Sequence, residues 1–138
     1  MVTNDRSGHG VVPHTFLASG RRLYLAPRGQ ARIGWEEPAS PGTVLLTASG
    51  EFDGECVGCL RRALADAGRD ATVCTFLDVS RVTFGDSSFL YELLTAHGGH
   101  ARLVLVGPLP SQLGRLFEIT GTHRLFHFAT DRADAGLS

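Results

Sequence analysis

The chain has 138 residues and a mass of 14.8 kDa, the size of one ordinary domain. Hydrophobic residues make up 43% and charged residues 20%, proportions that exclude a wholly disordered chain or a coiled-coil rod. The formal net charge of -1 gives no basic surface for nucleic acid, and no stretch approaches the roughly 18 apolar residues that cross a bilayer. Because the three cysteines are too few for a disulfide scaffold and no apolar leader opens the chain, we expect a cytoplasmic protein.

Residues 1–30 differ from the rest of the chain because glycine and proline interrupt every short apolar piece. Their apolar residues keep neither the period of a helix nor that of a strand for more than a few positions. We therefore expect a flexible N-terminal arm over residues 1–30, with one short edge strand near residues 22–26. The folded domain is then expected to span residues 31–138.

From residue 31 onward, segments typical of strands alternate with segments typical of helices. Runs of β-branched and aliphatic residues predict strands, whereas apolar residues three and four apart predict helices. Strands are expected at residues 31–35, 43–49, 71–79, 102–107 and 125–128, helices after Asp53 and Asp86 and over residues 111–119, and a last helical turn over residues 131–135. This order predicts an α/β fold with a mixed, mostly parallel sheet of about five strands packed by three to four helices.

Two aspartates stand where helices are expected to begin. Because an aspartate there accepts hydrogen bonds from backbone N–H groups of the first turn, Asp53 and Asp86 are predicted N-caps. Ser87 and Ser88 follow in the first turn of the second of these helices. Polar residues at such a position need no function beyond capping. A phosphoryl group there would, however, meet the positive end of the helix dipole, which suits a phosphorylation switch.

Three short motifs stand out after residue 31. Residues 50–53 read Gly-Glu-Phe-Asp, residues 84–90 read Phe-Gly-Asp-Ser-Ser-Phe-Leu, and residues 116–121 read Leu-Phe-Glu-Ile-Thr-Gly. In this order and spacing they resemble the STAS domain of bacterial anti-sigma factor antagonists, with its Gly-Glu-Leu-Asp motif, its Asp-Ser-Ser-Gly-Leu signature and a late Leu-Phe…Gly stretch. The resemblance covers roughly four-fifths of the chain, which is one typical domain.

The resemblance implies a switch protein that acts by binding rather than by catalysis and has no cofactor of its own. Family members bind an anti-sigma factor that is also a serine kinase; phosphorylation of the second serine of the signature ends this binding, and a serine phosphatase restores it. The resemblance therefore implies Ser88 as the phosphoacceptor, with Ser87 as the lesser candidate. The residues implied to contact the partner are Glu51, Asp53, Asp86, Ser87 and Phe89.

Phe89 stands where the family has glycine. A glycine lets the backbone of a partner approach closely, whereas a phenylalanine ring would crowd that approach unless the ring turns into the core. Phe89 precedes Leu93 by four residues, a spacing that permits burial on one helix face. An alternative function is therefore a STAS scaffold or ligand-sensing module that is not phosphorylated.

A second alternative, an enzyme, rests on Cys56 and Cys59. A Cys-x-x-Cys motif at the start of a helix is typical of thiol–disulfide oxidoreductases, in which the helix dipole lowers the pKa of a thiol. The two cysteines are equally well explained as small packing residues on one helix face. A zinc site would need two further ligands, and the histidines do not supply them at the required spacing, so we expect no metal site.

Overall fold

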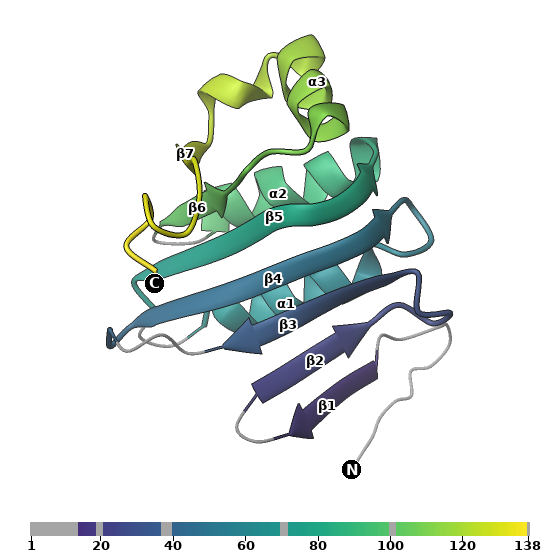
Figure 1. Cartoon of the computed structure of the whole chain (residues 1–138). Helices are drawn as coiled ribbons and strands as arrows, with labels where there is room; N and C mark the ends of the chain where they lie inside the picture. The colour runs from purple at the N-terminus through teal and green to yellow at the C-terminus, as the bar shows by residue number, and fades with distance from the viewer. Residues whose placement is uncertain (1–13, 19–20, 37–39, 70–71, 100–101, 138) are drawn as a thin grey trace.

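The computed structural model describes residues 14–18, 21–36, 40–69, 72–99 and 102–137, in which seven strands form one sheet (Figure 1). The strands lie side by side in chain order, antiparallel from β1 to β4 and parallel from β4 to β7. Their bounds are His14–Ala18 (β1), Arg21–Leu25 (β2), Ala31–Glu36 (β3), Thr43–Phe52 (β4), Cys74–Gly85 (β5), Leu103–Val106 (β6) and His127–Ala129 (β7). The predicted mixed sheet is confirmed, with two strands more than the expected five or so.

The additional strands come from the segment that we expected to be an arm. The side chain of Tyr24 on β2 is fully buried, and its hydroxyl donates a hydrogen bond of 2.7 Å to the Asp66 carboxylate. The guanidinium of Arg22 lies 4.2 Å from the centre of the Trp35 ring on β3, a cation–π contact. The expected boundary at residue 31 thus falls inside the sheet, and β2 is an inner strand rather than an edge strand. Residues 1–13 of the expected arm lie outside the described residues.

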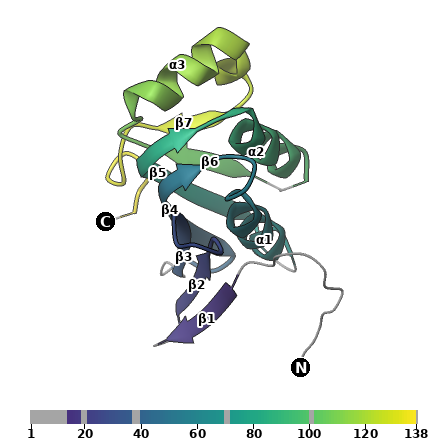
Figure 2. The same cartoon turned by 90° about the vertical axis from the view of Figure 1, so that its right-hand side faces the viewer.

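Three α-helices connect the parallel strands: α1 (Gly58–Ala67), α2 (Ser87–Gly99) and α3 (Ser111–Thr120). Helices α1 and α2 lie on the same face of the sheet, whereas α3 lies at the end of the sheet formed by β6 and β7 (Figures 1 and 2). A short 3₁₀ helix, Thr122–Arg124, joins α3 to β7. None of the helices in the described part of the chain combines the length and the apolar character needed to span a bilayer.

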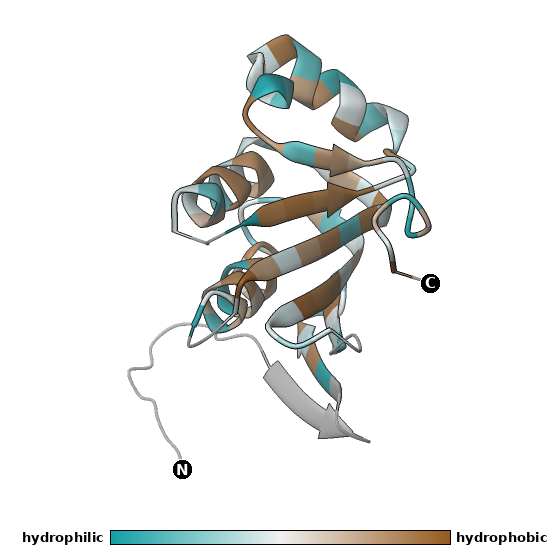
Figure 3. Cartoon of the chain, turned by 90° about the vertical axis from the view of Figure 1, so that its left-hand side faces the viewer, coloured by the Kyte–Doolittle hydropathy of each residue, from teal (hydrophilic) through white to brown (hydrophobic). Residues whose placement is uncertain are grey.

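The main core fills the space between the sheet and helices α1 and α2 (Figure 3). Its largest fully buried side chains come from both halves of the sheet and from all three helices: Tyr24, Ile33, Leu46, Phe52, Leu60, Leu77, Phe89, Leu93, Leu103, Leu105, Leu113 and Phe117. Each such side chain stabilises the fold by about 1.5–3 kcal/mol relative to an exposed one. This layer fixes where β4, β5 and α2 meet.

The C-terminal segment, residues 130–137, covers part of the opposite face of the sheet (Figure 3). Ala135 and Leu137 pack against a small second cluster that includes Phe76 of β5 and Val106 of β6. The Nε atom of Arg132 lies 2.8 Å from the Oδ2 atom of Asp78, whose side chain is buried. The tail is therefore held by apolar contacts and by one ion pair.

Candidate functional site

The carboxyl ends of β4 and β5 lie next to each other, and the chain enters helix α2 at this edge (Figure 1). In the parallel register, Glu51 lies opposite Phe84 and Phe52 lies opposite Gly85. The backbone N–H of Asp86 donates a hydrogen bond of 3.3 Å to the carbonyl of Phe52. In parallel sheets this edge is where binding residues gather, because the loops that follow each strand start there. The structure thus brings the first two motifs together.

Asp86 caps helix α2, as predicted. Its Oδ1 atom accepts hydrogen bonds from the backbone N–H groups of Ser88 at 2.8 Å and Phe89 at 3.3 Å. These N–H groups belong to the first turn, where no intrahelical partner exists. The cap fixes the direction in which the serines at the start of α2 project.

Asp53 has a similar role in the preceding loop, but it does not directly precede the helix. Its Oδ1 atom accepts hydrogen bonds from the N–H groups of Glu55 at 2.9 Å and Cys56 at 3.1 Å. A hydrogen bond from the Cys56 thiol, followed by that from the Glu55 N–H, holds the pKa of the Asp53 carboxyl below its ordinary value. Helix α1 begins only at Gly58, so Asp53 caps the turn that leads into it.

Ser87 is exposed and Ser88 is half-buried at the start of α2. A Cβ atom added to Gly54 would lie 3.3 Å from the Oγ atom of Ser88, so the turn after β4 passes directly beside this hydroxyl. Four carboxylates belong to the two segments that meet here: Glu51 at the end of β4, Asp53 and Glu55 in the turn after it, and Asp86 before α2. An anion on Ser88 would therefore add to the negative charge of these segments.

The prediction that Phe89 contacts a partner is wrong. Its side chain is fully buried, and its ring lies 5.4 Å from that of Phe52 in a tilted aromatic pair. The ring occupies the space above Gly85, where an added Cβ atom would lie only 2.8 Å from the Cδ2 atom of Phe89. The ring therefore points into the core and leaves the surface at Ser88 open.

Sequence reasoning missed Gln112, on the first turn of α3. Its side-chain oxygen accepts a hydrogen bond of 2.8 Å from the Gly85 N–H, and its side-chain nitrogen donates one of 2.7 Å to the Gly85 carbonyl. The two residues are 27 positions apart, so no local pattern could have indicated the contact. Two exposed aromatic side chains, Phe84 and Tyr91, were also missed, although each lies within four residues of Ser88.

The two cysteines of the Cys-x-x-Cys motif are buried, and the Cys59 thiol donates a hydrogen bond of 3.4 Å to the carbonyl of Cys56. Burial raises the pKa of the Cys56 thiol, and the neighbouring Asp53 raises it further. Burial also raises the pKa of Cys59 to about 11. A redox thiol needs a lowered pKa, so this geometry favours packing residues over an oxidoreductase site. Within the described residues, no group of three or more His, Cys, Asp or Glu side chains could hold a metal ion.

Of three comparisons with known proteins, the search of solved structures gave matches. A scan against models of protein families and a search of curated proteins each gave no match. An anti-sigma factor antagonist from Mycobacterium paratuberculosis aligns with a TM-score of 0.63 and 22% identity, over 80% of this chain and 94% of its own. The Bacillus cell fate determinant SpoIIAA in its phosphorylated form aligns at 0.57 and 22%, over 75% and 96%. The chain has the fold of these proteins.

The unphosphorylated form of the anti-sigma factor antagonist SpoIIAA aligns as well, with a TM-score of 0.53 and 22% identity, over 73% of this chain and 90% of its own. All three aligned structures are covered almost entirely, so the likeness concerns the whole STAS fold and not a fragment of it. The expected fold class is thereby confirmed.

Proposed function

We propose that this protein is an anti-sigma factor antagonist that binds its partner through the edge of the sheet at β4, β5 and α2. Its STAS fold and its first two motifs, which meet at that edge, support this role. The protein would act by contact rather than by catalysis, in the cytoplasm and without a cofactor. Its partners would be an anti-sigma factor with serine kinase activity and a serine phosphatase.

The observation that carries the proposal is the position of Ser88. It follows the N-cap Asp86 at the start of α2, half-buried and beside Gly54, with its neighbour Phe89 turned into the core. Phosphorylation would add about -1.5 to -2 charges at this point. Such a change can end a protein–protein contact, because a buried or poorly matched charge at an interface costs affinity.

The surface around Ser88 also indicates what the partner offers. The carboxylates of Glu51 and Glu55 are exposed, and so are the aromatic rings of Phe84 and Tyr91. Charged groups across an interface are arranged to be complementary, and aromatic side chains are enriched at its centre. The partner is therefore expected to present cationic side chains to Glu51 and Glu55 but apolar side chains to the aromatic rings and to the Ser88 hydroxyl, where the charge of a phosphate would be unmatched.

The test is binding of the wild type and three variants to each kinase-type anti-sigma factor of the source genome, by calorimetry. The wild type and Ser88→Ala should bind, and Ser88→Asp should bind at least tenfold more weakly, a loss of about 1.4 kcal/mol. Ser40→Asp is the matched control: it puts the same charge on an exposed serine in the turn before β4, at the other end of that strand, and should bind like the wild type. Mass spectrometry after incubation with ATP should find one phosphate, on Ser88. Equal binding by the wild type and Ser88→Asp would contradict the switch. Binding without any phosphate transfer would favour the unphosphorylated scaffold.

A further inference from the structure

A second apolar surface lies at the end of the sheet where α3 and β7 are found, away from the N-terminal strands (Figure 1). In the described part of the chain seven large hydrophobic side chains are exposed, and four of them belong to this surface: Leu109, Ile119, Leu125 and Phe128. None of these four is among the residues expected to contact an anti-sigma factor. Exposed apolar side chains that gather in one place indicate a binding surface, whereas scattered ones need no explanation.

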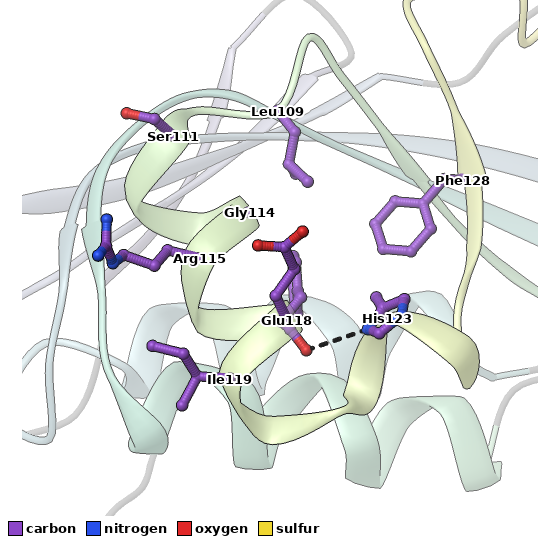
Figure 4. A pocket seen from close by; sticks show the side chains of 9 residues that line it. Leu109, Ser111, Gly114, Arg115, Glu118, Ile119, His123 and Phe128 are labelled. Carbon is purple, nitrogen blue, oxygen red and sulfur yellow. Dashed lines mark hydrogen bonds between the residues drawn. The ribbon is translucent and has the colours of Figure 1, made fainter.

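A groove of about 770 Å³ lies between α3 and β7 on this surface (Figure 4). Leu109 and Phe128 border it, and the Phe128 ring packs edge-on against that of the buried Phe117 at 5.6 Å. Ligand sites usually have about 300–1,000 Å³, so this groove can take several side chains at once. Strand β7 is the last of the sheet, and no strand of the described chain pairs with its outer edge, which favours an extended segment as the occupant.

Gly114 on α3 keeps the groove open. It lines the groove, and a Cβ atom added to it would meet one atom outside its own helix within 4 Å, a methyl carbon of Leu109 at 3.8 Å. That distance is an ordinary contact, so packing within the chain does not require a glycine here. In the middle of a helix, glycine is less favourable than every residue except proline. The space that its missing side chain leaves in the groove gives this glycine a reason.

The groove also holds a carboxylate. Glu118 projects into it from α3, on the side of Phe128 (Figure 4). Among the described residues, none donates a hydrogen bond to this carboxylate or forms an ion pair with it. The guanidinium of Arg115 points away from Phe128 (Figure 4), and Nδ1 of His123 lies 3.4 Å from the Phe117 carbonyl oxygen. A carboxylate among apolar side chains is complementary to a cation that an apolar segment carries.

An arginine fits this arrangement better than a lysine does. Its planar guanidinium donates two parallel hydrogen bonds to one carboxylate and packs flat on an aromatic ring, so it can contact Glu118 and Phe128 together. Apolar side chains next to the arginine would reach Leu109 and, beyond the groove, Leu125. A small molecule confined to the groove would leave Leu125 exposed, so the observations favour a protein segment as the occupant.

We propose that the groove between α3 and β7 is a docking site for an extended segment of a protein partner, in which an arginine stands between apolar side chains. Glu118 holds the guanidinium, and the space beside Gly114 takes an apolar side chain. The groove is lined by none of the residues expected to contact an anti-sigma factor, and this second site does not rest on the proposed function.

The experiment selects peptides from a phage-displayed library of short random sequences on the immobilised full chain and measures them in solution by fluorescence anisotropy. The selected peptides should carry an arginine flanked by apolar side chains. Gly114→Leu fills the groove and should weaken their binding at least tenfold without lowering the melting temperature. Gly98→Leu is the matched control, because it puts the same side chain on an exposed glycine of α2 with nothing within 4 Å, and it should bind like the wild type.

Glu118→Gln keeps the size of the side chain but removes its charge, and it replaces Gly114→Leu should that variant not fold. It should weaken binding about as much as exchanging the arginine of the peptide for glutamine does, and the two changes together should weaken it little further. A selection that yields no peptide, or only peptides that bind both variants as tightly as the wild type, would overturn the inference. The anti-sigma factor is absent from this experiment, so either result leaves the calorimetric test of the proposed function independent.

Discussion

The ring of Phe89 fills the space in the core that the missing side chain of Gly85 leaves free. The ring of Phe89 lies where a side chain on Gly85 would otherwise be, and it pairs with Phe52 at 5.4 Å. A phenylalanine at the position of the family glycine is accommodated because the residue four positions earlier has no side chain. Sequence spacing indicated that Phe89 could be buried, but only the backbone of β5 shows what makes room for it.

Gly85→Ala is therefore expected to destabilise the fold by about 1–3 kcal/mol, the usual cost of overpacking a core. In a Phe89→Ala background the added methyl group no longer meets the ring and only a methyl group of Leu113, at 2.9 Å, remains close to it, so the cost should fall by about 1 kcal/mol or more. Urea unfolding of the two single variants and the double variant measures this coupling. Additive costs would show that Phe89 and Gly85 do not compete for one space.

The Cys59 thiol is expected to make the free energy of unfolding depend on pH. Its pKa is raised from 9.0 to about 11 by burial, so the folded protein holds this proton where the unfolded chain releases it. The free energy of unfolding is therefore unaffected below the unfolded pKa and falls as the pH rises from there toward the folded value. Thermal unfolding between pH 8 and 11 should show a steeper loss for the wild type than for Cys59→Ala, by up to about 2–3 kcal/mol at the top of this range. Identical pH profiles would mean that the Cys59 thiol ionises as easily in the fold as outside it.

Among the helices and strands, features that depend on neighbouring residues were predicted correctly from the sequence, whereas features that depend on pairing between distant segments were not. Asp86 as the cap of α2 follows from its own residue type and position, and the hydrogen bonds confirm it. Strand β5, by contrast, continues to Gly85 instead of ending near Val79, because its last residues pair with the end of β4 despite the exposed Arg81 and Thr83. Only that pairing, which is invisible along the chain, makes a strand of them.

The C-terminal segment shows the same limit, since its ion pair joins residues 54 positions apart. Arg132→Ala removes the partner of the buried Asp78 carboxylate, which keeps its hydrogen bonds from the backbone and side chain of Ser80. Because Arg132 itself is partly exposed, we expect a cost of about 1–3 kcal/mol rather than that of breaking a fully buried pair.

The matched control for this prediction is Arg115→Ala, which removes an exposed arginine from α3 and should change stability by no more than about 0.5 kcal/mol. Urea unfolding gives the stabilities, and limited proteolysis reports whether the tail has left the sheet. Equal stability of the Arg132 and Arg115 variants would mean that the ion pair does not hold the tail.

For the whole molecule, the alternation of strands and helices after residue 31 was enough to predict the fold class. This alternation did not predict how many strands precede residue 31 in the sheet. The apolar run of β2, Leu23-Tyr24-Leu25, is too short to show a period of its own, and only its pairing with β3 makes it an inner strand of the sheet. The partner contacts were implied by the family resemblance alone, and the structure adds that the first two motifs meet at the carboxyl ends of β4 and β5. The contact between Gln112 and Gly85 could not be predicted, because it joins a side chain of α3 to the backbone of β5, 27 positions earlier in the chain.

Whether the folded domain includes residues 21–30 can be tested with a chain that lacks them. A chain of residues 31–138 lacks the buried Tyr24 and the Arg22 guanidinium above Trp35, and it exposes the open edge of β3. Its free energy of unfolding should fall by at least about 3 kcal/mol, the cost of deleting one buried aromatic side chain, and the fluorescence of Trp35 should shift to longer wavelength. Tyr24→Phe, which keeps the ring but loses the hydrogen bond to Asp66 and the longer one of 3.5 Å from Arg22, should cost about 1 kcal/mol and leave the emission unchanged. If the truncated chain matched the full chain in both stability and emission, the first thirty residues would be a dispensable arm after all, and the sheet of the functional domain would begin at β3.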